Sequence, residues 1–336
     1  MNNLSFGIDL GTDNIRIYHS DTDEILMEKN MIAIENKKNV FAYGNSAYEM
    51  YEKAPSNINI SYPLSYGVIA DINNMETLVR FYIQNILKNN VKPADYYIAV
   101  PTDVTEVEKR AFYDLIKESN VKARKIMVVE KAIADGLGLD IDIKNSQGVL
   151  VVDVGFQTTE ISILSLGGIV LSRLIKVGGL NFDEAIKNQV RKEFSLFIGG
   201  KTSENVKTHL KELEAAGEDA VVYGRDIVTG LPVERAISTR SVDEALNDDF
   251  NTIIDNIKVI LERTPPELSA DIYRHGIYLT GGGSMVNHLA EKIANGTNLK
   301  VNISPNPENS VTLGLAKVIK DDSYKSVAYS IEGMGK

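Results

Sequence analysis

The sequence contains no cysteine and only four histidines among its 336 residues. Without cysteine the chain forms no disulfide, carries no thiolate nucleophile and offers no cysteine ligand to a metal. The histidines are not closely paired, which argues against a zinc site. These absences exclude disulfide-stabilised folds, cysteine enzymes and the common zinc centres.

Long apolar runs are also missing. No apolar stretch approaches the roughly 20 residues that a membrane-spanning helix needs. The first expected strand begins within a few residues of Met1. We therefore expect neither a signal peptide nor an N-terminal amphipathic anchor helix, and we predict a cytoplasmic protein.

Positive charge is scarcer than negative charge. The chain has 36 Lys and Arg against 46 Asp and Glu, a net charge of −10, and its pI is about 5.1. This balance argues against a general nucleic-acid binder and against electrostatic attraction to anionic lipid. The composition, 43% hydrophobic and 24% charged, is that of an ordinary globular protein. The length predicts about two domains.

One stretch, residues 148–160 (GVLVVDVGFQTTE), combines features that suit a magnesium–phosphate site. A short β-branched run, residues 149–152, is typical of a buried strand and ends at Asp153. A turn containing Gly155 follows, and residues 158–163 alternate like a returning strand. Backbone N–H groups of such a turn can face phosphate oxygens while the acid holds hydrated Mg²⁺. An ordinary hairpin explains this stretch equally well when it is taken alone.

The same pattern occurs near the start of the chain. Residues 5–8 form an apolar run that ends at Asp9, residues 10–14 read LGTDN, and residues 15–18 alternate again. Two such hairpins would hold one polyphosphate from opposite sides. A duplicated motif is much harder to attribute to chance than a single one.

Strands and helices alternate along the rest of the chain, which predicts mostly parallel sheets covered by helices. Ser241 and Glu244 have the spacing of a capping box, and the proline pair at 265–266 ends the helix that they open. Residues 323–336 lack periodicity and are expected to form a loose tail. We expect helices at 75–87, 104–119, 131–137, 182–194, 203–213, 241–263, 284–294 and 311–320, and strands at 96–100, 125–129, 276–279 and 300–303.

Five segments stand in a characteristic order: residues 9–14, the loop at Asp71, and residues 129–138, 153–160 and 281–283. Together they resemble the actin/heat-shock-70/sugar-kinase superfamily, and within it the MreB family of bacterial actins. The resemblance extends over residues 4–320 and rests on IDLGTDN, YGVIAD, AVPTDVTEVEKRAF, VVDVGFQTTEISILSLGGIV, KVGGLNFDEAI, ERTPPELSADIYRHGIYLTGGGSM and VTLGLAKVI.

The resemblance implies an α/β, actin-like fold. Two related halves, each with a mixed, mostly parallel sheet covered by helices, enclose a nucleotide cleft. The expected subdomains are IA (1–30, 72–145 and 310–322), IB (31–71), IIA (146–179 and 240–309) and IIB (180–239), followed by a flexible tail (323–336).

The resemblance also implies ATP or ADP with Mg²⁺ as cofactors, and it assigns the site residues. Taken singly, the glycines would be turn formers and the pair Glu204 and Lys207 a solvated helix pair. Asp9 and Asp153 match the acids that hold Mg²⁺, mainly through water. The expected nucleotide contacts are Gly11, Thr12, Asp13 and Asn14 in the first phosphate loop, Gly155, Phe156, Gln157 and Thr158 in the second, Gly178 and Gly179, Glu204 and Lys207 near the ribose and adenine, and Gly281, Gly282 and Gly283 at the adenosine.

Two departures from the family pattern bear on catalysis. Lys131 stands where the family has a glutamate that, with the threonine matching Thr158, polarises the attacking water. A protonated lysine has no lone pair to accept a proton, and losing a general base costs about 10²–10⁴-fold. Phe156 and Gln157 replace two glycines. We predict weak hydrolysis with Thr158, Lys131 and Asp153 as the catalytic set; a one-residue shift that puts Glu130 in the catalytic position is the alternative.

The predicted function is that of a cytoskeletal protein. Subunits that stack head to tail form filaments, and by resemblance these pair antiparallel and govern cell shape. The polar loop at 88–93, the reduced catalytic set and a composition rich in Asn, Lys and Ile also resemble divergent paralogues from wall-less helical bacteria, which implies a role in helical form and motility instead of wall synthesis. Expected partners are further copies of the chain and paralogous bacterial actins. The polar loop at 88–93 predicts weak direct membrane contact, with cortical placement through partners.

Three other functions stay open from the sequence. The first is a fully active MreB-type ATPase in cell-wall elongation. The second is a heat-shock-70-like chaperone ATPase, against which the missing substrate domain counts. The third is a sugar or acyl kinase, which would need a base in the cleft for the acceptor hydroxyl.

Overall fold

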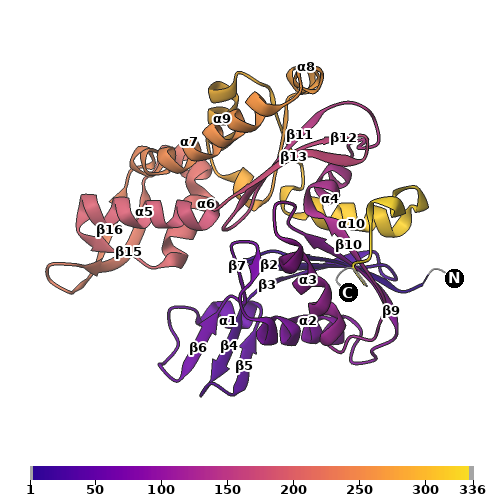
Figure 1. The fold of residues 1–336 in the computed structure, drawn as a ribbon. Helices are drawn as coiled ribbons and strands as arrows, with labels where there is room; N and C mark the ends of the chain where they lie inside the picture. Colours follow the sequence, from indigo (N-terminus) through magenta and orange to yellow (C-terminus); the bar gives the residue numbers. More distant parts are fainter. Residues whose placement is uncertain (1–2, 333–336) are drawn as a thin grey trace.

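The computed structural model describes residues 3–332, and its first half is built on a five-stranded mixed sheet (Figure 1). The strand order is β10-β9-β1-β2-β3. β1 pairs in parallel with β9, and β9 with β10, while β2 is antiparallel to both of its neighbours. All strands but β2 therefore run in one direction. The bounds are β1 Ser5–Leu10, β2 Asn14–His19, β3 Glu24–Lys29, β9 Ala94–Val100 and β10 Ala123–Glu130.

The second half repeats this plan in a sheet of order β13-β12-β11-β17-β18. β12 is the reversed strand, and β11, β17 and β18 are parallel. The duplicated hairpin predicted from the sequence is therefore present at equivalent places in two sheets. The bounds are β11 Val149–Val154, β12 Thr159–Ser165, β13 Gly168–Ile175, β17 Ile277–Thr280 and β18 Val301–Ile303.

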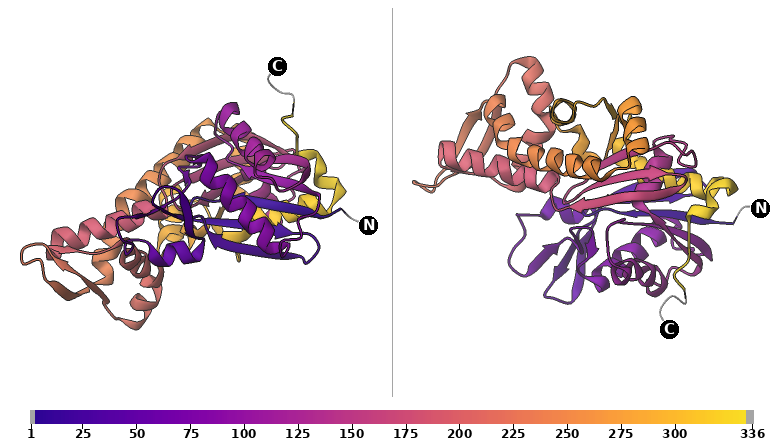
Figure 2. Two further views of the ribbon diagram at one scale, coloured as in Figure 1. Left: turned by 90° about the horizontal axis from the view of Figure 1, so that it is seen from below. Right: turned by 45° about the horizontal axis from the view of Figure 1, so that its top comes forward.

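Helices cover the faces of both sheets (Figure 2), and α2 and α7 bury apolar side chains at helical spacing. In α2 the side chains of Leu78, Val79 and Tyr82 are buried at helical spacing. α3 begins with a capping box between Thr105 and Glu108, which satisfies free N–H groups of its first turn. The bounds are α2 Ile72–Ile86, α3 Glu106–Glu118, α4 Lys131–Gly138, α7 Thr239–Arg263, α8 Pro266–His275, α9 Leu289–Thr297 and α10 Ser310–Lys320.

Two helices, α4 and α10, cross at the junction of the halves. A side chain at Gly138 would meet the carbonyl oxygen of Ser310 at 1.8 Å, and one at Gly314 would meet that of Ala134 at 1.8 Å. The two backbones therefore touch, and only glycine allows this approach. A buried apolar cluster around this crossing includes Val129, Val151 and Leu315, so strands of both sheets share one core.

A smaller lobe extends from each half. The first contains β4, β5, β6 and α1, and the second contains β14, β15, β16, α5 and α6 (Figure 1). The first lobe has its own small core around Met31, Ala33 and Ala47. The bounds are β4 Ile32–Glu35, β5 Asn39–Tyr43, α1 Asn45–Met50, β6 Ile58–Ser61, β7 Leu64–Ser65, β8 Val68–Ile69, α5 Gly179–Phe194, β14 Leu196–Phe197, α6 Gly200–Ala216, β15 Ala220–Asp226 and β16 Pro232–Ile237.

Four local predictions differ from the structure. The capping box predicted from Ser241 and Glu244 does not open the helix: α7 begins at Thr239, and the side chain of Ser238 accepts a hydrogen bond of 3.2 Å from the N–H of Ser241. The expected helix at 284–294 is a 3₁₀ turn, Gly282–Met285, followed by α9, because His288 is left-handed with φ of 66°. The proline pair ends α7 as predicted, but Pro266 also starts α8, where its missing N–H costs nothing. The prediction of a loose tail at 323–336 is wrong for residues 323–332, since Tyr329 and Val128 exchange backbone hydrogen bonds of 2.8 and 3.0 Å; its last four residues lie outside the described part of the chain.

Within residues 3–332, no helix is both long enough and apolar enough to cross a bilayer.

Candidate functional site

A cavity of about 380 Å³ lies between the two halves, a size typical of small-molecule sites. Both sheets, α4 and α6 contribute to its walls. Most of the predicted residues are brought together here, and only Gln157 and Gly178 do not line it. The predicted residues in the wall are Asp9, Gly11, Thr12, Asp13, Asn14, Lys131, Asp153, Gly155, Phe156, Thr158, Gly179, Glu204, Lys207, Gly281, Gly282 and Gly283.

The two acid-tipped strands are equivalent. Asp9 is the fifth residue of β1 and Asp153 the fifth of β11. In the turns that follow, the N–H of Gly11 donates to the carbonyl of Asn14 at 3.0 Å, and that of Gly155 to Thr158 at 2.8 Å. Repeated strand and turn geometry thus places one carboxylate and one tight turn on each side of the cavity.

Both carboxylates are nearly withdrawn from solvent, with 5% of Asp9 and 4% of Asp153 exposed. Burial raises the pKa of Asp9, although Lys131 and Arg16 lower it and the charge of Asp153 raises it further. Two acids that share one enclosed space favour a nearby cation.

Gly281, which follows β17 directly, lies in a crowded part of the cavity wall. Gly281 has φ of 83°, and a side chain there would lie 2.1 Å from Oδ1 of Asp153. No L-residue would fit this position without moving the acid. Gly281 therefore shapes the wall beside Asp153.

Lys131 begins α4 and lies inside the cavity wall. Its Nζ is 2.7 Å from Oδ2 of Asp153, and 21% of the lysine side chain is exposed. Burial on its own lowers the pKa of Lys131, but the carboxylates of Asp153, Asp9 and Asp135 raise it by more, so that the pKa lies above its usual value. The group is a fixed cation at neutral pH.

Glu130 is directed elsewhere. Its Oε1 accepts a hydrogen bond from Lys109 at 2.9 Å and another from the hydroxyl of Tyr329 at 2.7 Å. It does not line the cavity, whereas Lys131 does. The alternative alignment that puts Glu130 in the catalytic position does not agree with this geometry.

The turn after β11, residues 155–158, contacts the opposite half of the molecule. Oε1 of Gln157 accepts a hydrogen bond of 2.7 Å from the backbone N–H of Tyr66, so its side chain does not line the cavity. The ring of Phe156 lies 5.8 Å from that of Tyr62. Gly178 packs beneath the loop, where a side chain would meet the carbonyl of Gly155 at 2.6 Å. Phe156 and Gln157, which stand where the family pattern has two glycines, therefore connect the two halves.

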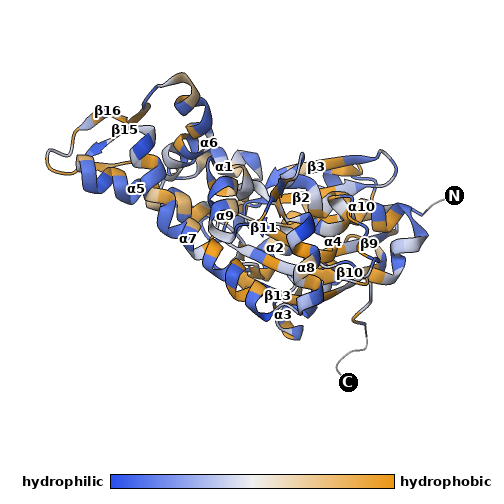
Figure 3. Ribbon diagram, turned by 90° about the horizontal axis from the view of Figure 1, so that it is seen from above, coloured by the Kyte–Doolittle hydropathy of each residue, from blue (hydrophilic) through white to orange (hydrophobic). Residues whose placement is uncertain are grey.

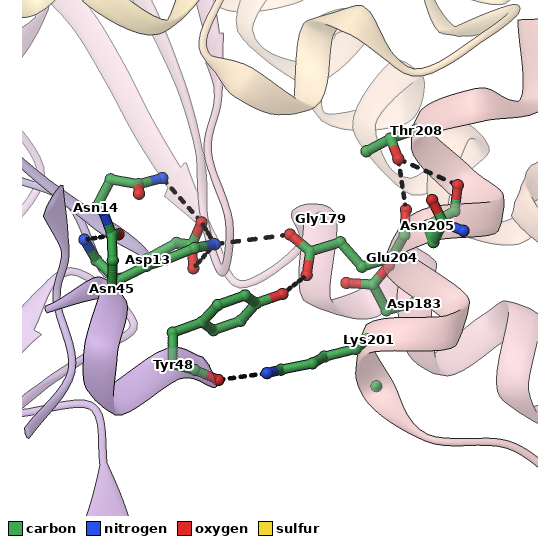
Figure 4. A network of polar contacts seen from close by, with 12 residues as sticks. Asp13, Asn14, Asn45, Tyr48, Gly179, Asp183, Lys201, Glu204, Asn205 and Thr208 are labelled. Carbon is green, nitrogen blue, oxygen red and sulfur yellow. Dashed lines mark hydrogen bonds and ion pairs between the residues drawn. The ribbon is translucent and has the colours of Figure 1, made fainter. Parts of the chain in front are cut away.

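Helix α6 lines the cavity on the side of the second half, and hydrogen bonds connect it to α1 of the first half (Figure 4). The hydroxyl of Tyr48 donates to the carboxylate of Glu204, and Nζ of Lys29 lies 3.6 Å from the same group. Lys29 also donates to Asp13 at 2.8 Å. Glu204 thus belongs to a polar network that connects the halves, and it is more than the solvated helix residue of the alternative interpretation.

Lys207 is held in place by a buried ion pair. Its Nζ lies 2.8 Å from Asp183 and donates to the carbonyl of Gly179 at 3.1 Å. Burial raises the pKa of Asp183 to about 6, against the lowering effect of Lys207. The sequence did not single out Asp183, which turns this lysine from a solvated residue into a fixed part of the wall.

Several other wall residues were missed. Arg16 and Glu160 lie opposite Asp9 and Asp153 in their hairpins, and the pairing of returning strands would have found them. Lys211 follows Lys207 by one helical turn, which also marks it from sequence. Glu308 comes from a short 3₁₀ helix, Pro307–Asn309, far along the chain and carries no local signal.

The acids fit a magnesium ion bound through water. Within residues 3–332 there is no group of three or more His, Cys, Asp or Glu side chains arranged around a metal. Two carboxylates are nevertheless suitable, since Mg²⁺ usually keeps several waters and takes its other ligands from phosphate. Asp9 and Asp153 would hold such an ion.

Two halves with the same strand order around one cavity, each with an acid-tipped strand and a tight turn, define an actin-like protein. The model of the family described as MreB/Mbl protein matches residues 3–326. The chain therefore belongs to the MreB/Mbl family, as the sequence motifs predicted.

Relatives of known role share about a third of the sequence. The cell shape-determining protein Mbl of Bacillus subtilis (strain 168) is 36% identical over 312 residues, which are 92% of this chain and 93% of that protein. The cell shape-determining protein MreB of Escherichia coli (strain K12) is 33% identical over 330 residues, with 95% and 93% covered.

Solved structures agree with the fold. The crystal structure of MreB5 of Spiroplasma citri bound to ADP has a TM-score of 0.88 at 33% identity, covering 97% of this chain and 98% of that one. MreB5 of the same organism bound to AMPPNP gives 0.89 at 33% identity and the same coverage. The predicted actin-like fold is confirmed.

Proposed function

We propose that this protein is a nucleotide-dependent, filament-forming actin of the cell shape-determining type that hydrolyses ATP weakly. The observation that carries the proposal is the position of Lys131, which lies in the cavity wall 2.7 Å from Asp153. An ammonium in this place cannot accept a proton from an attacking water. The remaining wall keeps the groups that hold a nucleotide.

Each part of the wall has a role in binding. Backbone N–H groups of the two turns, at 11–14 and 155–158, face the phosphates, and Thr158 supplies a hydroxyl beside them. The ribose and adenine lie between α6, through Glu204 and Lys207, and the glycines 281–283. MreB5 of Spiroplasma citri, whose structures are described as bound to ADP and to AMPPNP, supports this assignment.

Magnesium supplies charge neutralisation to the phosphates when it is bound, with Asp9 and Asp153 as its protein ligands, mainly through water. Lys131 holds Asp153 in place. It also adds positive charge near the terminal phosphate, where it orients the group but takes no proton.

Self-association is supported by exposed apolar side chains on β15 and in the turn of the β15–β16 hairpin. Tyr223, Val228 and Leu231 are 67%, 83% and 62% exposed. Figure 3 shows this hairpin at one end of the molecule, remote from the N-terminus. Such side chains are typical of contact surfaces, and we propose that a second copy of the chain covers them. A head-to-tail contact that does not close produces a filament; we propose that filaments pair antiparallel, with paralogous actins as further partners.

The proposed cellular role is the control of cell shape or motility, with only weak direct contact between the protein and the membrane. The loop at 88–93 is polar, and its lysines and asparagines are exposed. Few apolar groups are therefore available there to enter a bilayer. Placement in the cytoplasm beneath the membrane would depend on partner proteins.

Phosphate release tests the catalytic part of the proposal. The wild type should release phosphate slowly under polymerising conditions, and Lys131→Glu should raise the rate by about 10²-fold, the lower end of the effect of a general base. Glu130→Gln is the matched control and should leave the rate unchanged. A wild-type rate equal to that of an ordinary MreB, or a Lys131→Glu rate equal to wild type, refutes weak hydrolysis through Lys131.

Pelleting with nucleotide, followed by negative-stain microscopy, tests assembly. We expect paired filaments with ATP and few or none without it. Soluble, unassembled protein at high concentration in every nucleotide state would refute the filament proposal.

A further inference from the structure

The charge balance of the cavity leads to a second proposal, which rests on the nucleotide site proposed above. Lys131 lies in the field of four buried or largely buried carboxyl groups, with 1–5% of each exposed. These groups come from β1, α4, β11 and β12. They are Asp9, Asp135, Asp153 and Glu160.

The ammonium of Lys131 already contacts the carboxylate of Asp153, and both residues line the cavity. Its 2.7 Å distance from Oδ2 is that of a charge-assisted hydrogen bond. Only 5% of the Asp153 side chain is exposed, so water screens this pair weakly. The first amino acid of α4 therefore places one permanent positive charge where a nucleotide site ordinarily depends on its metal.

A second cation stands beside the other acid. Arg16 is opposite Asp9 in the β1–β2 register, lines the cavity and is 8% exposed. Its Nε has no hydrogen-bond partner within residues 3–332, and its Nη2 reaches Glu308 only at 3.9 Å. A buried guanidinium with a free N–H favours an anion in the adjoining cavity.

Lys207, the buried lysine of the wall, is not available in the same way. Nζ of Lys207 is bound by Asp183 at 2.8 Å and by the carbonyl of Gly179. Lys131 and Arg16 are therefore the cations that offset Asp9 and Asp153.

We infer that Lys131, supported by Arg16, acts as a built-in counter-ion for the two acids and the polyphosphate, so that this protein binds ATP nearly as tightly without a divalent cation as with one. In most nucleotide sites the metal offsets the negative charge of phosphates and acids. Here the chain supplies part of that charge itself. Magnesium still binds through Asp9 and Asp153, but it adds little to the affinity.

Equilibrium binding of ATP in excess MgCl₂ and in excess EDTA, at matched ionic strength, tests this directly. For the wild type we expect the two dissociation constants to agree within about threefold. Lys131→Gln removes the charge, and its affinity in EDTA should fall by about tenfold relative to MgCl₂, the effect of one charge-assisted hydrogen bond. Lys131→Arg should restore the wild-type ratio, and Arg16→Gln added to Lys131→Gln should increase the dependence further.

Controls separate the possible failures. Lys258→Gln removes one positive charge from the exposed face of α7 and should behave as wild type. Circular dichroism verifies folding, and if the neutral variants unfold, the wild-type ratio alone decides. A wild-type affinity that falls by tenfold or more in EDTA, or a Lys131→Gln ratio equal to that of wild type, overturns the counter-ion role. Failure to bind ATP in both buffers would instead refute the nucleotide site itself.

Discussion

The hydroxyl of Tyr48, on α1, donates a hydrogen bond to the carboxylate of Glu204, on α6, and so joins the two halves of the molecule. Two lysine ammonium groups lie close to the Tyr48 ring: Nζ of Lys29 and Nζ of Lys201 are each 4.3 Å from its centroid. Glu204 also lines the cavity. One side chain therefore serves both the connection between the halves and the wall of the site.

Tyr48→Phe should loosen this connection and speed nucleotide release. Phenylalanine keeps the ring contacts and deletes only the hydroxyl, so we expect release of a fluorescent ATP analogue to accelerate about fivefold, the equivalent of about 1 kcal/mol. Stopped-flow displacement measures the rate. Tyr273→Phe, at a 73% exposed position on α8, is the control. Equal release rates in wild type and Tyr48→Phe would show that the bond does not hold the nucleotide.

Gly281→Ala should cost stability and abolish nucleotide binding. The new methyl group would combine a left-handed backbone with a 2.1 Å approach to Asp153. We expect a loss in the free energy of unfolding of at least about 2 kcal/mol. Gly230→Ala is a matched control, because Gly230 also has positive φ (71°) but nothing within 4 Å. It should cost about 1–2 kcal/mol for the backbone alone and keep ATP binding; a Gly281→Ala protein that binds ATP normally would contradict the role of this glycine.

The buried carboxyl group of Glu160 should make the free energy of unfolding decrease as the pH rises. Burial raises its pKa from 4.5 to about 7, although Lys131 and a hydrogen bond from Thr102 lower it. The folded state then holds the proton to higher pH than the unfolded chain, so the free energy of unfolding decreases as the pH rises between those values. The decrease is about 3 kcal/mol at most for this group.

Urea denaturation of wild type and Glu160→Gln at about pH 5 and about pH 8 measures this term, because glutamine does not ionise. The wild type should lose more stability than Glu160→Gln between the two conditions. Glu218→Gln, at an exposed loop position, should follow the wild type. Identical losses in wild type and Glu160→Gln would argue that Glu160 titrates normally.

Serine at Tyr223, Val228 and Leu231 should weaken assembly without unfolding the monomer. These side chains are exposed, so their removal costs the isolated subunit little, while a contact between copies would lose its apolar area. We expect the critical concentration in pelleting assays to rise about tenfold. The control replaces Val107 and Leu166, which are 80% and 73% exposed, with serine. If only the control impairs pelleting, subunits meet through another surface.

Local patterns in the sequence determined much of this fold. Alternation along 5–18 and 148–163 marked the two hairpins, and the acids and glycines between them marked the turns. These features were predictable because strand period and turn chemistry depend on neighbouring residues. The division into subdomains, drawn from resemblance, stays a prediction.

Side-chain directions were decided by the tertiary structure. Sequence left open whether Glu130 or Lys131 faces the cavity, and the packing of Glu130 against Lys109 and Tyr329 shows that it is Lys131. Gln157 likewise bonds to Tyr66, 91 residues away in the chain. Such partners have no local signature.

The sequence by itself thus determined the family, the repeated motif and the identity of the lysine at position 131. Only the tertiary structure brought that lysine to Asp153 and Glu204 to Tyr48. The physical reason is one of range. Backbone periodicity and turn geometry are fixed over a few residues, whereas the pairing of buried charges depends on how distant elements pack and exclude water.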